Sequence, residues 1–300
     1  MPELPEIISR AREMKRVLAG KTITGIEVIQ PKCLNMRPAT FKKRLTGAAV
    51  LDVTHHGKWL FIHTSQGYLL LNLGMGADVL LTTRKRLPEK YQFIFDLDDG
   101  KCMSVRFWWF GYVHYAPEGK LGKHEMTAKL GPDALEISRE EFREMVRGRR
   151  GGAKMFLLNQ ENIAGIGNAY VQDILFLAGL HPSTTLDRLK DDEIDRLWQA
   201  IRDGLLPAAK KGGSWYEKTL RGKPGGFLYE DLLVGYREGK PCPTCGTDVV
   251  KLRTGSTQSF ICPSCQRKKR AAVRKRTAKR SRAAAQADAV KKAAGKRRST

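Results

Sequence analysis

The stretch that most narrowly limits the fold is KPCPTCGTDVVKLRTGSTQSFICPSCQ, residues 240–266. It holds two Cys-x2-Cys pairs separated by sixteen residues: Cys242 with Cys245, and Cys262 with Cys265. Two such turns can present four thiolates as a tetrahedron, which is the ligand set of a structural zinc site. We therefore predict a four-cysteine zinc finger with one zinc ion over residues 236–266. Four thiolates leave no open coordination position, so this metal is expected to stabilise the module and not to catalyse.

The chain after this module is intensely basic. Residues 266–300 hold fifteen lysines and arginines against one acid, and the 300-residue chain carries a net charge of +23. Such an excess indicates a polyanionic partner, either nucleic acid or an anionic membrane surface. Because alanine, lysine, arginine and serine bury little, we expect residues 267–300 to be a disordered tail that adds non-specific affinity for a polyanion.

Composition excludes several classes of protein. A chain of 300 residues with 41% hydrophobic residues suits about two domains plus appendages. No run of eighteen apolar residues exists, and the first twenty residues lack the layout of a signal peptide. The two cysteines outside the pairs, Cys33 and Cys102, are isolated, which favours a metal site in a reducing compartment over a disulfide framework. We expect an intracellular protein with no membrane contact.

The pattern changes twice upstream of the finger. Pro5 opens a helical pattern that Gly20 is placed to end. Short β-rich runs then alternate with turn signals, which predicts an antiparallel sandwich or barrel with strands at 22–29, 48–53, 59–64, 68–73, 91–97 and 105–115. After a Gly-Pro boundary, helical patterns cover 139–149, 154–158, 169–178 and 191–206. We predict a multidomain α+β chain divided into a β-sandwich at 2–131, a helical domain at 132–235, the finger at 236–266 and the tail at 267–300.

The N-terminal string MPELPE carries a candidate nucleophile. Initiator methionine is normally removed before a small residue, and its removal would expose Pro2 as a free secondary amine. An α-amino group titrates at about 7.7–8.0, so a useful fraction is unprotonated at neutral pH. Attack of this amine on an aldehydic sugar carbon gives a cationic iminium, an electron sink for elimination, and Glu3 could protonate the sugar ring oxygen. The alternative is that Pro2 only precedes a helix.

Four segments in order resemble the formamidopyrimidine-DNA glycosylase and endonuclease VIII family, closer to its formamidopyrimidine-DNA glycosylase branch. They are PELPE (2–6), GKWL around Lys58, LLNQENIAGIGNAYVQDILFLAGLHP (157–182) and the finger. The resemblance implies a β-sandwich, a helix–two-turn–helix domain and a zinc finger. It also implies a bifunctional DNA glycosylase/AP lyase of base excision repair, which excises oxidised purines such as 8-oxoguanine and formamidopyrimidines by β,δ-elimination from a Pro2 Schiff base. Alternatives are oxidised pyrimidines or abasic sites as substrates, a non-catalytic damaged-DNA-binding protein, or a zinc-finger regulator.

The resemblance implies roles for individual residues. In catalysis it makes Pro2 the nucleophile, Glu3 the general acid and Lys58 a contact to the phosphate near the lesion. The residues implied in DNA binding are Asn168 and Lys154, and a wedge of Met75, Trp109 and Phe110 that fills the space left by a flipped base. For Met75 and Phe110 the alternative is ordinary packing in the sheet. Glu6 and Asp173 stand where the family keeps acids near the active site, with helix capping or a solvated position as alternatives.

Two departures from the family pattern both fall on DNA contacts. The wedge segment of the family usually reads like DPRRFG, whereas this chain has RFWWFG (106–111), which puts Trp109 where an arginine would hydrogen-bond the orphaned cytosine. An indole has one donor and no bidentate fork. The finger has Thr257 in place of the usual arginine, and Arg253 or Gln258 could replace that phosphate contact. We therefore expect that catalysis is preserved and that specificity is altered. The resemblance further implies a monomer of the bacterial cytoplasm that associates with the nucleoid. Its expected partner is double-stranded DNA that contains a damaged base.

Overall fold

The computed structural model of this chain describes residues 1–255 and 257–268. Residues 1–268 form one compact unit. The tail that we expect at 267–300 lies outside the described residues, except for its first two positions.

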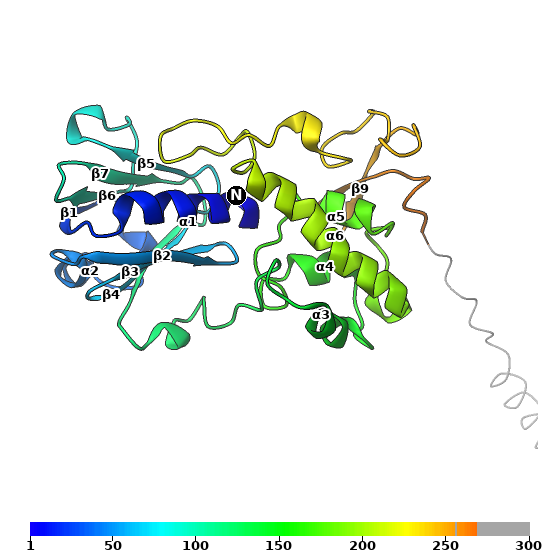
Figure 1. Cartoon of the computed structure of the whole chain (residues 1–300), viewed down its shortest axis with the longest axis horizontal. Helices are drawn as coiled ribbons and strands as arrows, with labels where there is room; N and C mark the ends of the chain where they lie inside the picture. Colours follow the sequence, from blue (N-terminus) through cyan, green and yellow to red (C-terminus); the bar gives the residue numbers. More distant parts are fainter. Residues whose placement is uncertain (256, 269–300) are drawn as a thin grey trace, which may run out of the picture. The chain divides into compact units, whose positions relative to one another are not determined.

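The first helix, α1 (Leu4–Leu18), begins and ends as its sequence predicts. Glu3 is the N-cap residue and forms a reciprocal capping box with Glu6, and a proline lies in the first turn. The apolar residues of the predicted face, such as Ile7 and Met14, are buried. The helix packs along β2 (Val50–His56) and also contacts α6 (Asp191–Lys210), so it joins the strand-rich and the helical parts of the chain (Figure 1).

Two four-stranded antiparallel sheets form the N-terminal part, with the strand orders β1-β6-β7-β5 and β2-β3-β4-β8. The remaining strands are β1 (Ile23–Val28), β3 (Trp59–Thr64), β4 (Gly67–Asn72), β5 (Asp78–Thr82), β6 (Phe93–Leu97), β7 (Cys102–Arg106) and β8 (Tyr112–Ala116). Side chains of both sheets and of α1 share one hydrophobic core. The arrangement is therefore the predicted sandwich and not a closed barrel.

The structure corrects the strand pattern at three places. The run 105–115 was expected to be one strand, but β7 ends at Arg106 and β8 begins at Tyr112. The side chain of Gln92 accepts from the backbone N–H of Phe107 and donates to its carbonyl, both at 2.9 Å. These two bonds take the place of the backbone hydrogen bonds that would continue the strand. The strand-rich region also contains two elements that the pattern missed, β5 and the helix α2 (Pro38–Leu45).

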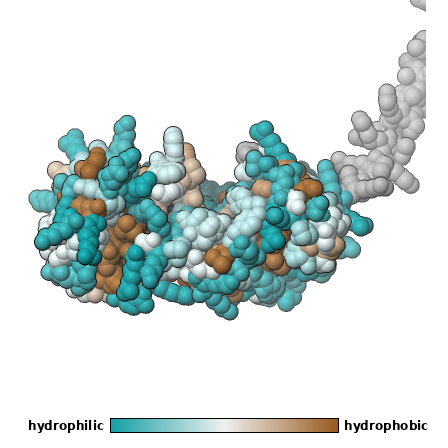
Figure 2. Space-filling model, turned by 90° about the horizontal axis from the view of Figure 1, so that it is seen from above, coloured by the Kyte–Doolittle hydropathy of each residue, from teal (hydrophilic) through white to brown (hydrophobic). Residues whose placement is uncertain are grey.

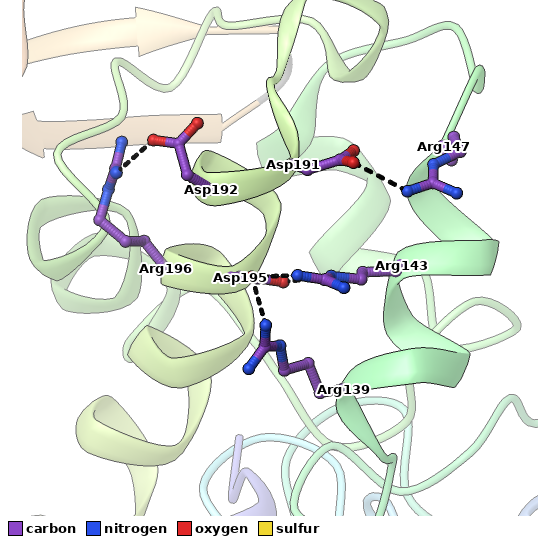
Figure 3. A network of polar contacts seen from close by, with 7 residues as sticks. All are labelled: Arg139, Arg143, Arg147, Asp191, Asp192, Asp195 and Arg196. Atoms are coloured by element: carbon purple, nitrogen blue, oxygen red, sulfur yellow. Dashed lines mark hydrogen bonds and ion pairs between the residues drawn. The ribbon is translucent and has the colours of Figure 1, made fainter.

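The helical part contains the four predicted helices, α3 (Arg139–Val146), α4 (Ala153–Leu158), α5 (Val171–Leu177) and α6, around a core of their own. Arg143 and Arg139 of α3 pair with Asp195 of α6, and Arg147 lies 2.9 Å from Asp191 (Figure 3). Exposed pairs of this kind contribute about 0–1 kcal/mol each, so the apolar core is the larger stabilising term. Single 3-10 turns occur at Pro31–Cys33, Arg84–Arg86, Leu121–Lys123, Leu186–Arg188 and Tyr229–Asp231.

The last described element is a hairpin of β9 (Val250–Thr254) and β10 (Thr257–Ile261). Phe260 of β10 packs with Phe176 of α5 and with Val234 in a small apolar cluster that includes two of the paired cysteines. The finger is therefore anchored on the helix that follows the glycine-rich turn GIGN (165–168).

Among the described residues, no helix combines the length and the apolar character that a membrane crossing requires. The face seen in Figure 2 is mostly polar, with separate apolar patches.

Candidate active site and nucleic-acid interface

Close backbone contacts bring three segments together at the N-terminus of α1. The backbone N–H of Leu4 donates to the carbonyl of Gly165 at 3.0 Å, which fixes the start of the helix on the glycine-rich turn. On the other side Gly57, with φ +54, packs so closely that an added Cβ would lie 2.6 Å from the Cβ of Ala164. The glycine thus lets the β2–β3 turn, and with it Lys58, approach the same place.

Glu3 is the centre of this meeting point. Its buried carboxylate accepts hydrogen bonds from the backbone N–H groups of Gly167 and Ala169, both at 2.8 Å, and from that of Tyr170 at 3.4 Å. An added Cβ on Gly167 would lie 2.3 Å from Oε1 of Glu3 and 2.8 Å from Nζ of Lys58. The carboxylate and the ammonium therefore face the same glycine, and only a residue without a side chain leaves room for both.

The electrostatics of Glu3 and Lys58 suit proton transfer. Burial raises the pKa of Glu3, and the nearby charge of Lys58 opposes that shift. Burial lowers the pKa of Lys58, and the charge of Glu3 opposes that shift in turn. A carboxyl group whose pKa is raised holds its proton longer near neutral pH, which is what a general acid needs.

Glu6 and Asp173 are both buried, so the solvated alternative is wrong for each. Glu6 accepts from the backbone N–H of Glu3 at 2.9 Å, from the hydroxyl of Tyr170 at 2.5 Å and from the backbone N–H of Ser214 at 2.9 Å. Asp173 accepts from the backbone N–H groups of three consecutive residues, Leu233, Val234 and Gly235, at 2.8–2.9 Å. Glu6 therefore positions the N-terminus, and Asp173 fixes the segment that leads into the finger.

The N-terminal residues contact a further acid that the sequence did not single out. Pro2 is buried, and the amino nitrogen of Met1 lies 3.8 Å from Oε1 of Glu217. Burial raises the pKa of Glu217 to about 7. A lone glutamate in the segment WYEKTL (215–220) belongs to no recognisable pattern, so only the fold could reveal it.

The wedge residues lie on two neighbouring loops and are exposed. The backbone N–H of Met75 donates to the carbonyl of Trp109 at 2.9 Å, and that of Trp108 donates to the carbonyl of Met75 at 2.8 Å. The exposed fractions are 41% for Met75, 62% for Trp109 and 66% for Phe110. The alternative of ordinary sheet packing is therefore wrong. Trp108, which the sequence reading passed over, is 68% exposed on the same loop.

Lys154 lies in the interior and contacts the finger. Its side chain is completely buried, and Nζ donates to the hydroxyl of Thr257 at 2.9 Å, the carbonyl of Gln258 at 2.6 Å and the hydroxyl of Ser259 at 2.9 Å. An ammonium enclosed in this way offers no free surface to a phosphate, so the expected DNA contact has no support here. Arg253 and Gln258, the candidates to replace the missing arginine, are exposed and lie opposite each other in the register of β9 and β10.

Asn168 is half-buried at the end of the glycine-rich turn. Its Oδ1 accepts from Nε2 of Gln172 at 3.1 Å, and the same nitrogen lies 3.2 Å from the carbonyl of Gln258 on the finger. Gln172, which the sequence reading missed, also accepts from the backbone N–H of Phe260 at 3.2 Å. This glutamine therefore couples the turn to the finger hairpin.

The four paired cysteines come together as predicted. Their sulfur atoms all lie within 4.8 Å of one another. In a tetrahedral zinc site with Zn–S bonds of about 2.3 Å, sulfur atoms are about 3.8 Å apart. The donor set and its spacing therefore fit one structural zinc ion.

Three family models match the chain in order. They are the formamidopyrimidine-DNA glycosylase N-terminal domain over residues 1–107, the formamidopyrimidine-DNA glycosylase H2TH domain over residues 130–219, and the zinc finger found in FPG and IleRS over residues 239–267. Together with the clustered thiols, the last match identifies a zinc finger with a structural ion.

The sequences and structures of known proteins are similar to this chain over nearly its whole length. A formamidopyrimidine-DNA glycosylase of Pelotomaculum thermopropionicum is 33% identical, over 90% of this chain and 100% of that relative. One of Thioalkalivibrio sulfidiphilus is 32% identical, over 89% and 100%. A solved complex of Lactococcus lactis Fpg with abasic-site DNA has a TM-score of 0.82 at 28% identity, over 89% of this chain and 100% of that chain. The chain belongs to the formamidopyrimidine-DNA glycosylase family of base excision repair enzymes.

Proposed function

We propose that this chain is a bifunctional DNA glycosylase/AP lyase that excises oxidised purines from double-stranded DNA, with Pro2 as the nucleophile and Glu3 as the general acid. The observation that carries the proposal is the buried carboxylate of Glu3, held by backbone N–H groups next to the N-terminus and Lys58. Lactococcus lactis Fpg has been solved with Fapy-dG-containing and N7-benzyl-Fapy-dG-containing DNA, which supports the substrate class.

The proposed reaction begins when the mature Pro2 nitrogen attacks the sugar carbon that bears the damaged base. The bond from this carbon to the base breaks, and its electron pair leaves with the base, which takes up a proton. Glu3 gives its proton to the ring oxygen, so the sugar opens and an iminium forms on Pro2. Loss of a proton from the neighbouring carbon then expels the 3′ phosphate, and a second elimination expels the 5′ phosphate.

Borohydride trapping on abasic-site DNA tests this assignment, because reduction turns the iminium into a stable amine. Chain with its mature N-terminus is compared with chain blocked by an extension ahead of Pro2. Pro5→Ala is the matched control, since it changes the proline in the first turn of α1, whose nitrogen lies inside the chain. We expect an adduct from the mature chain and from Pro5→Ala, and none from the blocked chain.

Lys58 is the rival nucleophile, because burial lowers its pKa and it faces the same space. If the blocked chain still forms an adduct and Lys58→Arg does not, the nucleophile is Lys58 and not Pro2. An adduct absent from every form would refute the lyase assignment.

We further propose that Asn168 and the exposed finger residue Arg253 contact the DNA backbone. Lys154 then supports the finger hairpin from the interior. The chain works as a cytoplasmic monomer that associates with the nucleoid. The net charge of +23 supports the association with DNA. We also propose that the domains span residues 2–131, 132–235 and 236–266. Light scattering would test the monomeric state, and limited proteolysis would test the domain limits.

A further inference from the structure

Four side chains form an exposed surface that we call the aromatic platform: Met75, Trp108, Trp109 and Phe110. Each is between 41% and 68% exposed, although all four are large and apolar. The ring centroids of Trp109 and Phe110 are 6.3 Å apart, so the two rings lie side by side. Exposed apolar patches of this kind mark interaction sites.

The backbone beneath the platform is adapted to hold it. Gly74, at φ +56, lies so close to the second loop that an added Cβ would be 2.2 Å from the carbonyl oxygen of Trp109. Gly76, at φ +62, would place a Cβ 2.8 Å from the indole of Trp108. Phe110 itself has φ 56, a conformation that a bulky residue adopts only when its surroundings impose it.

The occupant that fits the platform is a set of DNA bases. The loop of the platform is linked to the backbone of Lys58, because the side chain of Asn72, at the end of β4, donates to the carbonyl of Lys58 at 3.3 Å and accepts from the backbone N–H of Gly74. The chain is strongly basic, and every base offers a flat face on which an aromatic ring can stack.

The platform has almost no means of reading the edge of a base. Its only side-chain hydrogen-bond donors are the indole N–H groups of Trp108 and Trp109, and neither indole can make a bidentate contact. The guanidinium of Arg106 lies over the ring of Trp108 at 5.6 Å from its centroid and 3.6 Å from the carboxylate of Asp78. The charge of Arg106 is therefore engaged with the ring of Trp108 and the carboxylate of Asp78.

The family resemblance already implies that Met75, Trp109 and Phe110 fill the duplex beside the flipped nucleotide. We propose that in this chain the aromatic platform does so by stacking alone, and that the chain therefore processes its lesion without preference for the opposite base. This inference rests on the proposed function and adds to it the specificity for the base opposite the lesion. Stacking depends on ring area, which all four bases provide, whereas discrimination depends on directed donors and acceptors, which the platform lacks.

The test uses four duplexes that carry the same abasic site opposite adenine, cytosine, guanine or thymine. An abasic site has no base to unpair, so differences in rate report only on the opposite base. We expect the four single-turnover cleavage rate constants to agree within about threefold. A preference of tenfold or more for one opposite base would overturn the inference, while absence of cleavage and of a trapped adduct on all four would refute the proposed function instead.

Variants locate the effect on the platform. The double variant Trp108→Ala/Trp109→Ala should bind all four duplexes about tenfold more weakly, since stacking contributes about 1–3 kcal/mol per base, which corresponds to roughly 5- to 150-fold in affinity. Leu51→Ala, at another exposed apolar position (54% exposed), is the matched control and should leave binding unchanged. Trp109→Arg supplies a fork and should introduce a preference among opposite bases. Unchanged binding by the double variant would overturn the role of the platform.

A spectroscopic readout is independent of cleavage. With 2-aminopurine opposite a tetrahydrofuran abasic analogue, stacking on an indole should quench its fluorescence on binding, and the double variant should lose this quenching. Equal quenching by the double variant would also count against the inference.

Discussion

Replacing Gly167 by alanine should disable the general acid by displacing the side chain of Glu3, which itself is left unsubstituted. The added Cβ would lie 2.3 Å from Oε1 of Glu3, whereas ordinary contacts lie at 3.4–4 Å, so the carboxylate must move by about 1 Å. Gly167 has an ordinary backbone conformation, so the effect is steric and not one of backbone strain. A displacement of about 1 Å at a reacting group costs about 100-fold in rate. We therefore expect Gly167→Ala to lose about two orders of magnitude in single-turnover excision.

The assay compares single-turnover excision of a lesion base and borohydride trapping at 25 °C with thermal unfolding of the same samples. Gly122→Ala is the matched control, because an added Cβ there meets nothing within 4 Å. The displaced carboxylate also loses part of its hydrogen bonding, and bonds to charged groups contribute about 1.5–3 kcal/mol each, so a modest fall in Tm should accompany the loss of rate. Excision by Gly167→Ala within threefold of the unchanged chain, with Gly122→Ala also unaffected, would refute the placement of Glu3.

Three further predictions concern the rest of the molecule. Burial lowers the pKa of His114 from 6.5 to about 4, so between these values the unfolded chain binds more protons and stability falls as the pH falls, by up to about 3 kcal/mol. His114→Gln should flatten that part of the curve of unfolding free energy against pH, and an unchanged slope would contradict the assignment. Removing zinc with a chelator, or the change Cys262→Ser, should unfold the finger and abolish DNA binding, as measured by circular dichroism and fluorescence anisotropy; retained binding would show that the finger is dispensable. In the unchanged chain a carboxylate oxygen of Asp173 accepts from the backbone N–H of Leu233, and Asp173→Asn would place an NH2 group opposite that N–H. Denaturant unfolding should therefore show a loss of about 1–3 kcal/mol in unfolding free energy. A loss below about 0.5 kcal/mol would contradict the anchoring role.

The sequence predicted those elements whose signals are local. The cysteine pairs, the helix that Gly20 ends and the strand at 59–64 depend on spacing within a few residues, and the structure confirms each one. The break at 107–111 could not be foreseen, because it depends on the side chain of Gln92, fifteen residues away along the chain. The residues of the break, FWWF (107–110), are as apolar as the strands on either side, so the apolar pattern continues where the strand does not.

The candidate site divides in the same way. Pro2 and Glu3 could be proposed because their chemistry lies in their own side chains and in the family resemblance. Lys154 was expected at the DNA, yet it is buried against the finger hairpin; a lysine in an amphipathic helix has the same sequence signal in either place. Glu217 was missed because its contact with the N-terminus joins residues more than two hundred positions apart.

Opposing effects set the pKa of the Glu3 carboxyl group. Glu3 is the N-cap of α1, and a helix N-terminus by itself favours the charged form of a carboxyl group and so lowers its pKa. The hydrogen bonds from Gly167 and Ala169 act in the same direction, and so does Lys58. Burial is the largest effect and outweighs them, so the pKa of Glu3 is raised. The retention of its proton near neutral pH therefore depends on the close packing of three distant segments around Gly167, and any change that admits water there should lower the pKa of Glu3 to that of an ordinary surface acid.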